Sequence, residues 1–80
     1  MKLSIYSLKK VLFQGNAQLL NCKTQMGEIT VLDNHEPLIT VLTQGTARVD
    51  DESGKAHYFE IKSGFLEVKE GSEVRCIVEQ

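Results

Sequence analysis

The sequence predicts an all-β protein, a small β-sandwich of about eight to ten short and mostly antiparallel strands. Apolar and polar residues alternate with a period of two along most of the chain, which is the pattern of a half-buried strand. Turn-forming residues recur at about every 8–12 positions, and no stretch has the apolar spacing of an amphipathic helix. Because 80 residues leave no room for a second hydrophobic core, residues 1–80 are expected to form one domain.

The first half of the chain is a series of short apolar segments separated by turns. Gln14-Gly15-Asn16 is a turn signal that is predicted to end the second segment. In the third segment Gln18, Leu20 and Cys22 are expected to share one face, because they are spaced two residues apart. The fifth segment, residues 38–42, is almost entirely apolar and is expected to be covered on both faces. The predicted strands of this half cover residues 2–7, 11–13, 17–23, 28–32, 38–42 and 46–49.

The second half alternates more regularly. The polar segment Asp50–Gly54 predicts a hairpin loop, and Ser63-Gly64 and Glu70-Gly71 predict two further turns. The strands between these turns are expected at residues 57–62, 65–68 and 73–78. The predicted core collects the inward-facing residues of all these strands: Leu3, Ile5, Leu20, Cys22, Ile29, Val31, Val49, Phe59, Ile61, Leu66, Val68, Val74 and Cys76.

The composition excludes several classes of protein. Eleven acidic and nine basic residues are scattered along the chain, so there is no basic face for nucleic acid. No apolar run approaches 18 residues, and the N-terminus lacks the pattern of a secretory signal, so no membrane insertion is expected. Cys22 and Cys76 are distant in sequence and lie in apolar strand patterns. They are expected to be reduced and buried, as in a cytosolic protein, with a disulfide between them as the alternative.

One segment departs from the alternating pattern. Asp33-Asn34-His35-Glu36-Pro37 is polar, yet it lies between the two most apolar segments of the chain. Asn34 tolerates a left-handed turn conformation, and Pro37 fixes its own φ and extends the residue before it. We therefore expect a stiff, exposed loop, which is where small scaffolds commonly make their contacts.

The sequence gives little support for a catalytic site or for a site that binds a cofactor or metal. His35 lies beside two carboxylates, but zinc needs three or four ligands, and His57 has no further ligand at a useful spacing. Cys22 could act as a nucleophile with His35 only if its thiol were exposed and had a lowered pKa, which an apolar strand does not provide. No glycine-rich phosphate loop precedes a helix, so no nucleotide site is predicted. We expect a protein without enzymatic activity.

The segment from Gly27 to Leu38 resembles the strand and loop of the epsilon subunits of F-type ATP synthases. That family enters a β-branched strand through glycine and continues with Pro-x-His-x-Pro-Leu, for which this chain has Asp33-Asn34-His35-Glu36-Pro37-Leu38. The segment Gly64–Val68 is similar to the family's hairpin Gly-Gly-Ile/Phe-x-Glu-Val. The resemblance covers essentially the whole chain, including turn glycines at positions 15 and 45. Its departures are Asp33, Gln44 and Ser63, where proline, proline and glycine are common.

This resemblance implies a non-catalytic rotor subunit of the central stalk, which binds the gamma subunit and the c-ring and couples ion-driven rotation to ATP synthesis. It also implies a peripheral location on the cytoplasmic face of the membrane. Longer members continue into a helical hairpin that binds ATP or inhibits the catalytic head. This sequence stops with the last predicted strand, so it represents either a naturally short member or one domain of a longer protein, and we expect these 80 residues to do neither. The resemblance places Glu28 and the loop near the c-ring, and the following strand near gamma. The implied contact residues are Glu28, Asn34, His35, Pro37, Leu38 and Thr40.

Two other classes of protein remain open from the sequence. A free-standing β-sandwich that binds a peptide or small ligand should expose a cluster of aromatic side chains, for which only Tyr6 and Tyr58 are candidates. A small cysteine-dependent enzyme would need Cys22 or Cys76 to be exposed, with a lowered pKa.

Overall fold

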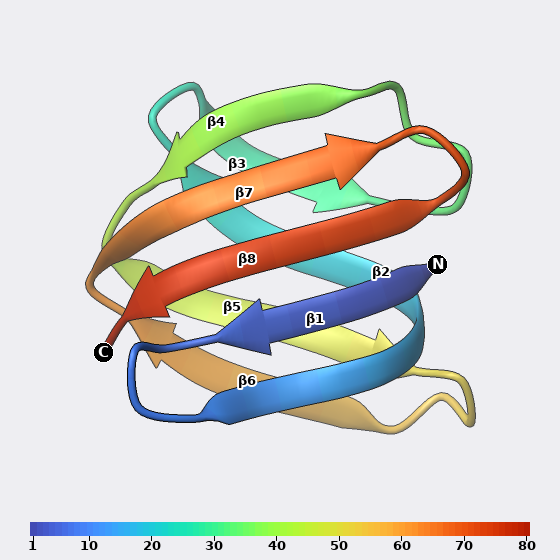
Figure 1. The fold of residues 1–80 in the computed structure, drawn as a ribbon, viewed down its shortest axis with the longest axis horizontal. Helices are drawn as coiled ribbons and strands as arrows, with labels where there is room; N and C mark the ends of the chain where they lie inside the picture. The colour runs from blue at the N-terminus through green and yellow to red at the C-terminus, as the bar shows by residue number, and fades with distance from the viewer.

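The computed structural model describes residues 1–80 and contains eight strands and no helix, which confirms the predicted all-β class (Figure 1). All strand pairs are antiparallel except β1 and β8, which run parallel. The strands are β1 (Lys2–Tyr6), β2 (Val11–Thr24), β3 (Gly27–Val31), β4 (Leu38–Leu42), β5 (Gly45–Asp51), β6 (Ala56–Ile61), β7 (Ser63–Lys69) and β8 (Glu73–Glu79).

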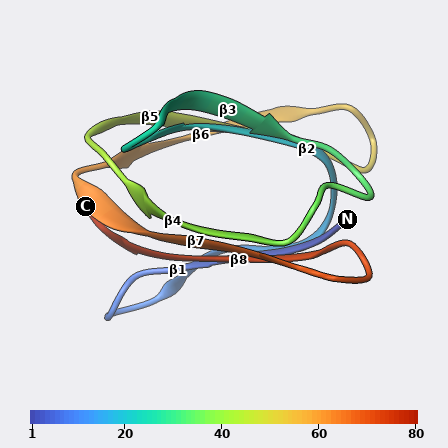
Figure 2. The ribbon, with the colours of Figure 1, turned by 90° about the horizontal axis from the view of Figure 1, so that it is seen from above.

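The strands form two layers that enclose the core, as the view from above shows (Figure 2). We call the layer of β4, β7, β8 and β1 the front sheet, in that order of pairing. The back sheet consists of β3, the second half of β2, β5 and β6. Because β2 also pairs with β1 through its first half, it connects the two layers.

The predicted turn at Gln14–Asn16 is wrong, because β2 continues unbroken through these residues over 14 positions. Its pairing with β5 shifts by one residue between Ala17 and Leu19, which is a β-bulge. A bulge bends the strand and changes which side chains face inward. Consequently Ala17 and Leu20 are both buried, whereas Gln18, predicted to share a face with Leu20, is exposed.

The core lies between the two sheets and agrees closely with the predicted one. All predicted core residues are buried except Ile29 and Phe59, which are partly buried and pack against the others. The remaining core side chains come mainly from strand ends and small residues, whose alternation is weak in the sequence. They are Met1, Ala17, Leu42, Ala47 and Val78.

Two predictions for the front sheet are wrong. The strand β4 is not covered on both faces, because it lies at the edge of the front sheet and its residue Ile39 is 73% exposed. Ser63 and Gly64 do not form a turn but are the first residues of β7, where Gly64 pairs with both Leu42 and Val78. A Cβ atom at position 64 would lie 2.3 Å from the backbone oxygen of Ile77, so the strands approach closely at this glycine.

Both cysteines are buried and unpaired, as predicted. Burial raises the pKa of the Cys22 thiol to about 11, and burial together with the nearby Cys22 raises the pKa of Cys76 as well. Since the thiolate is the reactive form, neither side chain is suited to nucleophilic chemistry.

We expect both thiols to react with a labelling reagent only as fast as the domain opens, because the folded state blocks access. The measurement is the rate of labelling in native buffer, compared with the rate in denaturant. Fast labelling of either cysteine without denaturant would mean that its strand faces the other way.

Candidate docking surfaces

All six sequence-predicted contact residues lie along one edge of the sandwich. The edge is formed by β3, which ends the back sheet, by β4, which ends the front sheet, and by the connection between them. We call it the β3–β4 edge; it is uppermost in Figure 1. The end of β2 reaches β4 at one pair only, Thr24 and Leu42, so most of this edge has no neighbouring strand.

Glu28 lies near the beginning of β3 and is exposed. Its position is set by the antiparallel pairing of β3 with β2, which puts Lys23 opposite. The side-chain amide of Asn21 donates a hydrogen bond of 3.1 Å to Glu28 Oε2 and another of 3.0 Å to Thr30 Oγ1. The carboxylate is thus held by an uncharged donor and keeps its negative charge available to a partner.

The loop between β3 and β4 has a defined shape. His35 N–H donates to the Leu32 carbonyl oxygen at 3.3 Å, which closes a turn, and Asn34 has a φ of 64°. Asparagine is one of the few residues that tolerate this left-handed conformation, as noted from the sequence. The His35 ring nitrogen Nδ1 lies 2.7 Å from the carbonyl oxygen of Glu36, so the imidazole is held against its own loop. Asp33, at the position where the resembling family has proline, forms an ion pair with the ammonium group of Met1.

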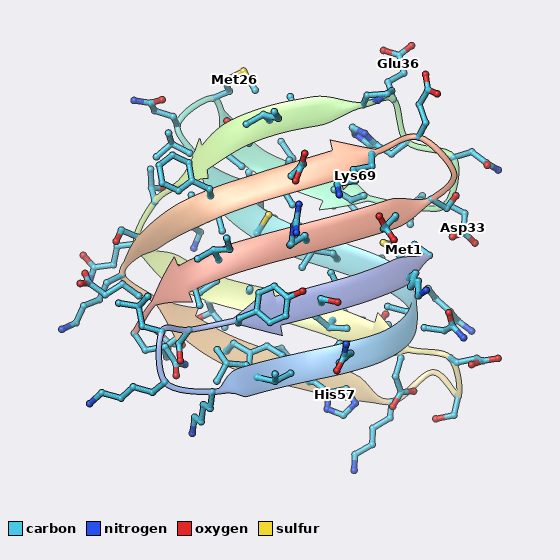
Figure 3. The ribbon with its side chains drawn as sticks, in the orientation of Figure 1. Met1, Met26, Asp33, Glu36, His57 and Lys69 are labelled. Atoms are coloured by element: carbon cyan, nitrogen blue, oxygen red, sulfur yellow. The ribbon has the colours of Figure 1, made fainter.

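The structure does not bring Glu28 and the loop together. Glu28 lies beside the turn that joins β2 to β3, whereas the loop follows the opposite end of β3. A strand rises about 3.3 Å per residue, so roughly 15–20 Å separate Glu28 from Asn34. In Figure 3, Met26 and Glu36 mark the two ends of this edge. The predicted contact is therefore two separate points along one edge.

The two predicted contact residues on β4 point toward the core. Thr40 is 8% exposed and Leu38 is partly buried, so a partner could reach little of either side chain. The residues that alternate with them, Ile39 and Val41, face outward because side chains alternate along a strand. The resemblance indicated the strand, but the outward face of that strand carries different residues.

An exposed row of apolar side chains crosses the outer face of the front sheet. The strand register pairs Val41 with Phe65, Phe65 with Ile77 and Ile77 with Tyr6, so the row spans β4, β7, β8 and β1. Ile39 lies beside it on β4. Phe65 is 60% exposed and Ile77 is 49% exposed, which is unusual for side chains of this size. We call Ile39, Val41, Phe65, Ile77 and Tyr6 the apolar row.

The charges beside the apolar row are paired within the sheet. Arg75 donates to Glu67 at 2.9 Å, and Lys69 lies 3.6 Å from Glu73. The Arg75 guanidinium holds the pKa of the Glu67 carboxyl below its ordinary value. A partner on this face would therefore meet apolar side chains beside charges that are already neutralised.

Phe65 and Ile77 were not among the contact residues predicted from the sequence. Both occupy outward positions of strands whose other outward residues are charged or polar, such as Glu67 and Arg75. A large apolar side chain at an outward position was the available signal. It became informative only when the register placed the two residues side by side.

The structure contains neither a metal-binding cluster nor a cluster of tyrosines. No group of three or more His, Cys, Asp or Glu side chains is positioned to hold a metal ion. Tyr6 belongs to the front sheet and Tyr58 to the back sheet, so the two tyrosines do not form an aromatic cluster. The structure contains no helix of the length and hydrophobicity needed to cross a bilayer. The exposed edge and the apolar row are features of a protein that docks onto others.

Comparison with known proteins identifies relatives of this chain. The family described as "ATP synthase, Delta/Epsilon chain, beta-sandwich domain" matches residues 1–80. The ATP synthase epsilon chain of Clostridium perfringens (strain 13 / Type A) is 29% identical over 76 residues, which cover 95% of this chain and 57% of the relative. The ATP synthase epsilon chain of Nitrosococcus oceani is 33% identical over 69 residues, covering 86% of this chain and 49% of the relative. The chain spans about half the length of these relatives.

Solved structures share the fold at low sequence identity. A chain in the mitochondrial ATP synthase of Euglena gracilis (OSCP/F1/c-ring, rotational state 1) superposes with a TM-score of 0.92 at 23% identity, over 100% of this chain and 51% of that one. A chain in the central stalk and c-ring of the Tetrahymena thermophila mitochondrial ATP synthase gives 0.83 at 13% identity, over 100% of this chain and 63% of that one.

Proposed function

Since this chain belongs to the family of ATP synthase delta/epsilon chain β-sandwich domains, we propose that it acts in the central stalk of an F-type ATP synthase. In this role it binds the gamma subunit and the c-ring, and it transmits ion-driven rotation toward the catalytic head without catalysing a reaction itself. It is peripheral to the membrane, on the cytoplasmic face. The observation that supports the proposal is the apolar row, in which Ile39, Phe65 and Ile77 are exposed on one face of the front sheet.

The apolar row is the proposed contact with gamma. Burying apolar surface contributes about 25 cal/mol per Å², so covering Ile39, Phe65 and Ile77 supplies a strong driving force. The row crosses four strands spaced about 4.8 Å apart, which gives a strip roughly 14 Å long between its outer strands. Because Glu67 and Arg75 are already paired, the matching surface of gamma should be apolar at its centre and polar at its rim.

The β3–β4 edge is the proposed contact with the polar loops of the c-ring. Its two polar points, Glu28 and the loop around His35, lie at opposite ends of one five-residue strand. A ring of identical subunits repeats the same surface, and neighbouring helices pack about 8–10 Å apart. Two separated points on one edge can therefore be met by different subunits of the ring.

We expect Glu28→Ala and His35→Ala to reduce ATP-driven ion pumping while ATP hydrolysis persists. Losing a hydrogen bond to a charged group weakens an interaction by about 1.5–3 kcal/mol, which would loosen the rotor under torque. The isolated domain should lose less than about 1 kcal/mol of stability, because Glu28 is exposed and His35 only partly buried. Pumping and hydrolysis are measured on the same vesicles, reconstituted with the complete synthase.

The control is Glu52→Ala, which removes an exposed carboxylate from the hairpin between β5 and β6. It should leave pumping unchanged. Normal pumping by both the Glu28 and His35 variants would remove the c-ring from the proposal and leave gamma as the partner. Unfolding of either variant would show that the edge is structural.

A further inference from the structure

We propose that Ser72, in the turn between β7 and β8, is a positioning residue that holds the β3–β4 loop in its docking conformation. Ser72 also ties that loop to the sheet that carries the apolar row. The effect on docking rests on the function proposed above, whereas the effect on the loop itself does not. Ser72 lies outside both proposed docking surfaces, and it acts through Asn34.

Ser72 and Asn34 contact each other although they are 38 residues apart in the chain. The backbone N–H of Asn34 donates to Ser72 Oγ at 3.0 Å, and the Ser72 hydroxyl lies 3.4 Å from Asn34 Oδ1, to which it can donate. The loop and the β7–β8 turn lie at the same end of the sandwich, at the right in Figure 1. One hydroxyl thus serves both the backbone and the side chain of Asn34.

The backbone at these two positions is unusual in the same way. Ser72 has a φ of 58° and Asn34 a φ of 64°, and they are the only residues other than glycine with a positive φ. A left-handed conformation costs free energy for residues with a Cβ and persists where the surroundings enforce it. The chain's two strained residues bond to each other, so each supports the conformation that the other adopts.

The turn that holds the loop is itself fixed. The carbonyl oxygen of Ser72 accepts a hydrogen bond of 2.8 Å from the backbone N–H of Lys2, at the beginning of β1. Ser72 thereby connects the loop to a turn that is bonded on its other side to the front sheet. Because the backbone of Ser72 is fixed by this hydrogen bond, its hydroxyl stays in place and can position the loop.

The contact between Asn34 and Ser72 links the β3–β4 loop to the hairpin that carries part of the apolar row. By covalent structure the loop joins only β3 and β4, the two strands at the open edge. Through Ser72 it is also joined to the hairpin of β7 and β8, which carries Phe65 and Ile77. A force on the loop is then transmitted to the outer face of the front sheet. The two docking surfaces behave as one mechanical unit.

The test of positioning is amide hydrogen exchange of the 80-residue chain, followed residue by residue by NMR. Ser72→Ala removes the hydroxyl and keeps a Cβ at the left-handed position. It is expected to raise the exchange rate of the Asn34 amide about five- to tenfold, the loss of one hydrogen bond. The matched control is Ser53→Ala, because the Ser53 hydroxyl also bonds within a turn, to Asp51 at 2.7 Å. The control should leave Asn34 unchanged.

Ser72→Gly separates the hydroxyl from the backbone conformation. Glycine adopts a positive φ without strain, so this variant folds at least as readily as the parent in the turn itself. The Asn34 amide should still exchange faster, because the acceptor is missing. If Asn34 stays protected in Ser72→Gly or in Ser72→Ala, the hydroxyl does not hold the loop and the inference is overturned.

The effect on docking is tested with the complete synthase in vesicles, where ion pumping and ATP hydrolysis are measured together. Ser72→Ala should reduce ion pumping, as His35→Ala does, while ATP hydrolysis continues. Faster exchange at Asn34 combined with normal pumping would keep the contact with Ser72 and overturn its role in docking. In that case normal pumping by His35→Ala as well would place the failure in the proposed function.

Discussion

Gly64→Ala is expected to destabilise this domain more than any other glycine substitution, lowering the free energy of unfolding by about 2–3 kcal/mol. The added Cβ would lie 2.3 Å from the carbonyl oxygen of Ile77 and 3.0 Å from the Cα of Val78. Both atoms belong to the backbone of β8, which is paired with β7 and cannot move aside without loss of its ladder hydrogen bonds. Typical domains have only about 5–15 kcal/mol of stability, so this loss is large.

The measurement is urea denaturation, with the midpoint and the slope compared between variants. Gly45→Ala is the matched control. Its added Cβ would meet only the side chain of Lys23, at 2.6 Å from Cδ, and that flexible chain can rotate away. Gly45→Ala should therefore stay close to the parent in stability. Equal stability of the two variants would show that β7 and β8 separate at Gly64 more easily than the structure indicates.

Phe65→Ala is expected to weaken binding to the gamma subunit at least about 30-fold, corresponding to a loss of roughly 2 kcal/mol. Phe65 lies between Val41 and Ile77 in the apolar row, and it is more exposed than Tyr6, the other aromatic side chain of the row. Buried aromatic anchors near the centre of an interface carry much of its binding energy. The side chain is 60% exposed in the free domain, so the fold should change little in stability.

Binding is measured by titration calorimetry with purified gamma subunit, and Tyr58→Ala is the control. Tyr58 is as exposed as Phe65, at 64%, but it lies on the back sheet. The Tyr58 variant should bind as the parent does. If both substitutions weaken binding equally, or if only the Tyr58 variant does, the docking face is the back sheet and the apolar row has another partner.

Local alternation was sufficient to predict the strands and most of the core, because each buried side chain is two residues from the next. The alternation did not distinguish a bend within a strand from a turn between two strands. Gly15 and Asn16 look like a turn, but in β2 they lie in a long strand that passes from one sheet to the other. The sequence pattern of such a bend and of a turn is the same, since both need small or polar residues.

The candidate surfaces were predictable only in part for a related reason. The resemblance indicated the β3–β4 edge, but the outward face of β4 depends on its pairing with β7, which local sequence does not specify. The row formed by Phe65 and Ile77, and the contact of Ser72 with Asn34, join residues that are distant in the chain. Such contacts arise from topology, and a single sequence without its fold contains no local trace of them.

The parallel pairing of β1 with β8 has a consequence for how this chain folds. Leu3 lies opposite Val74, so the first strand of the domain pairs with the eighth, more than 60 residues later in the chain. During translation β1 is paired only with β2 until β8 emerges, and the front sheet stays incomplete for that time. Domains dominated by such distant pairings typically fold in milliseconds to seconds. We therefore expect refolding on this timescale, and a nascent chain that depends on chaperones before its last strand is complete.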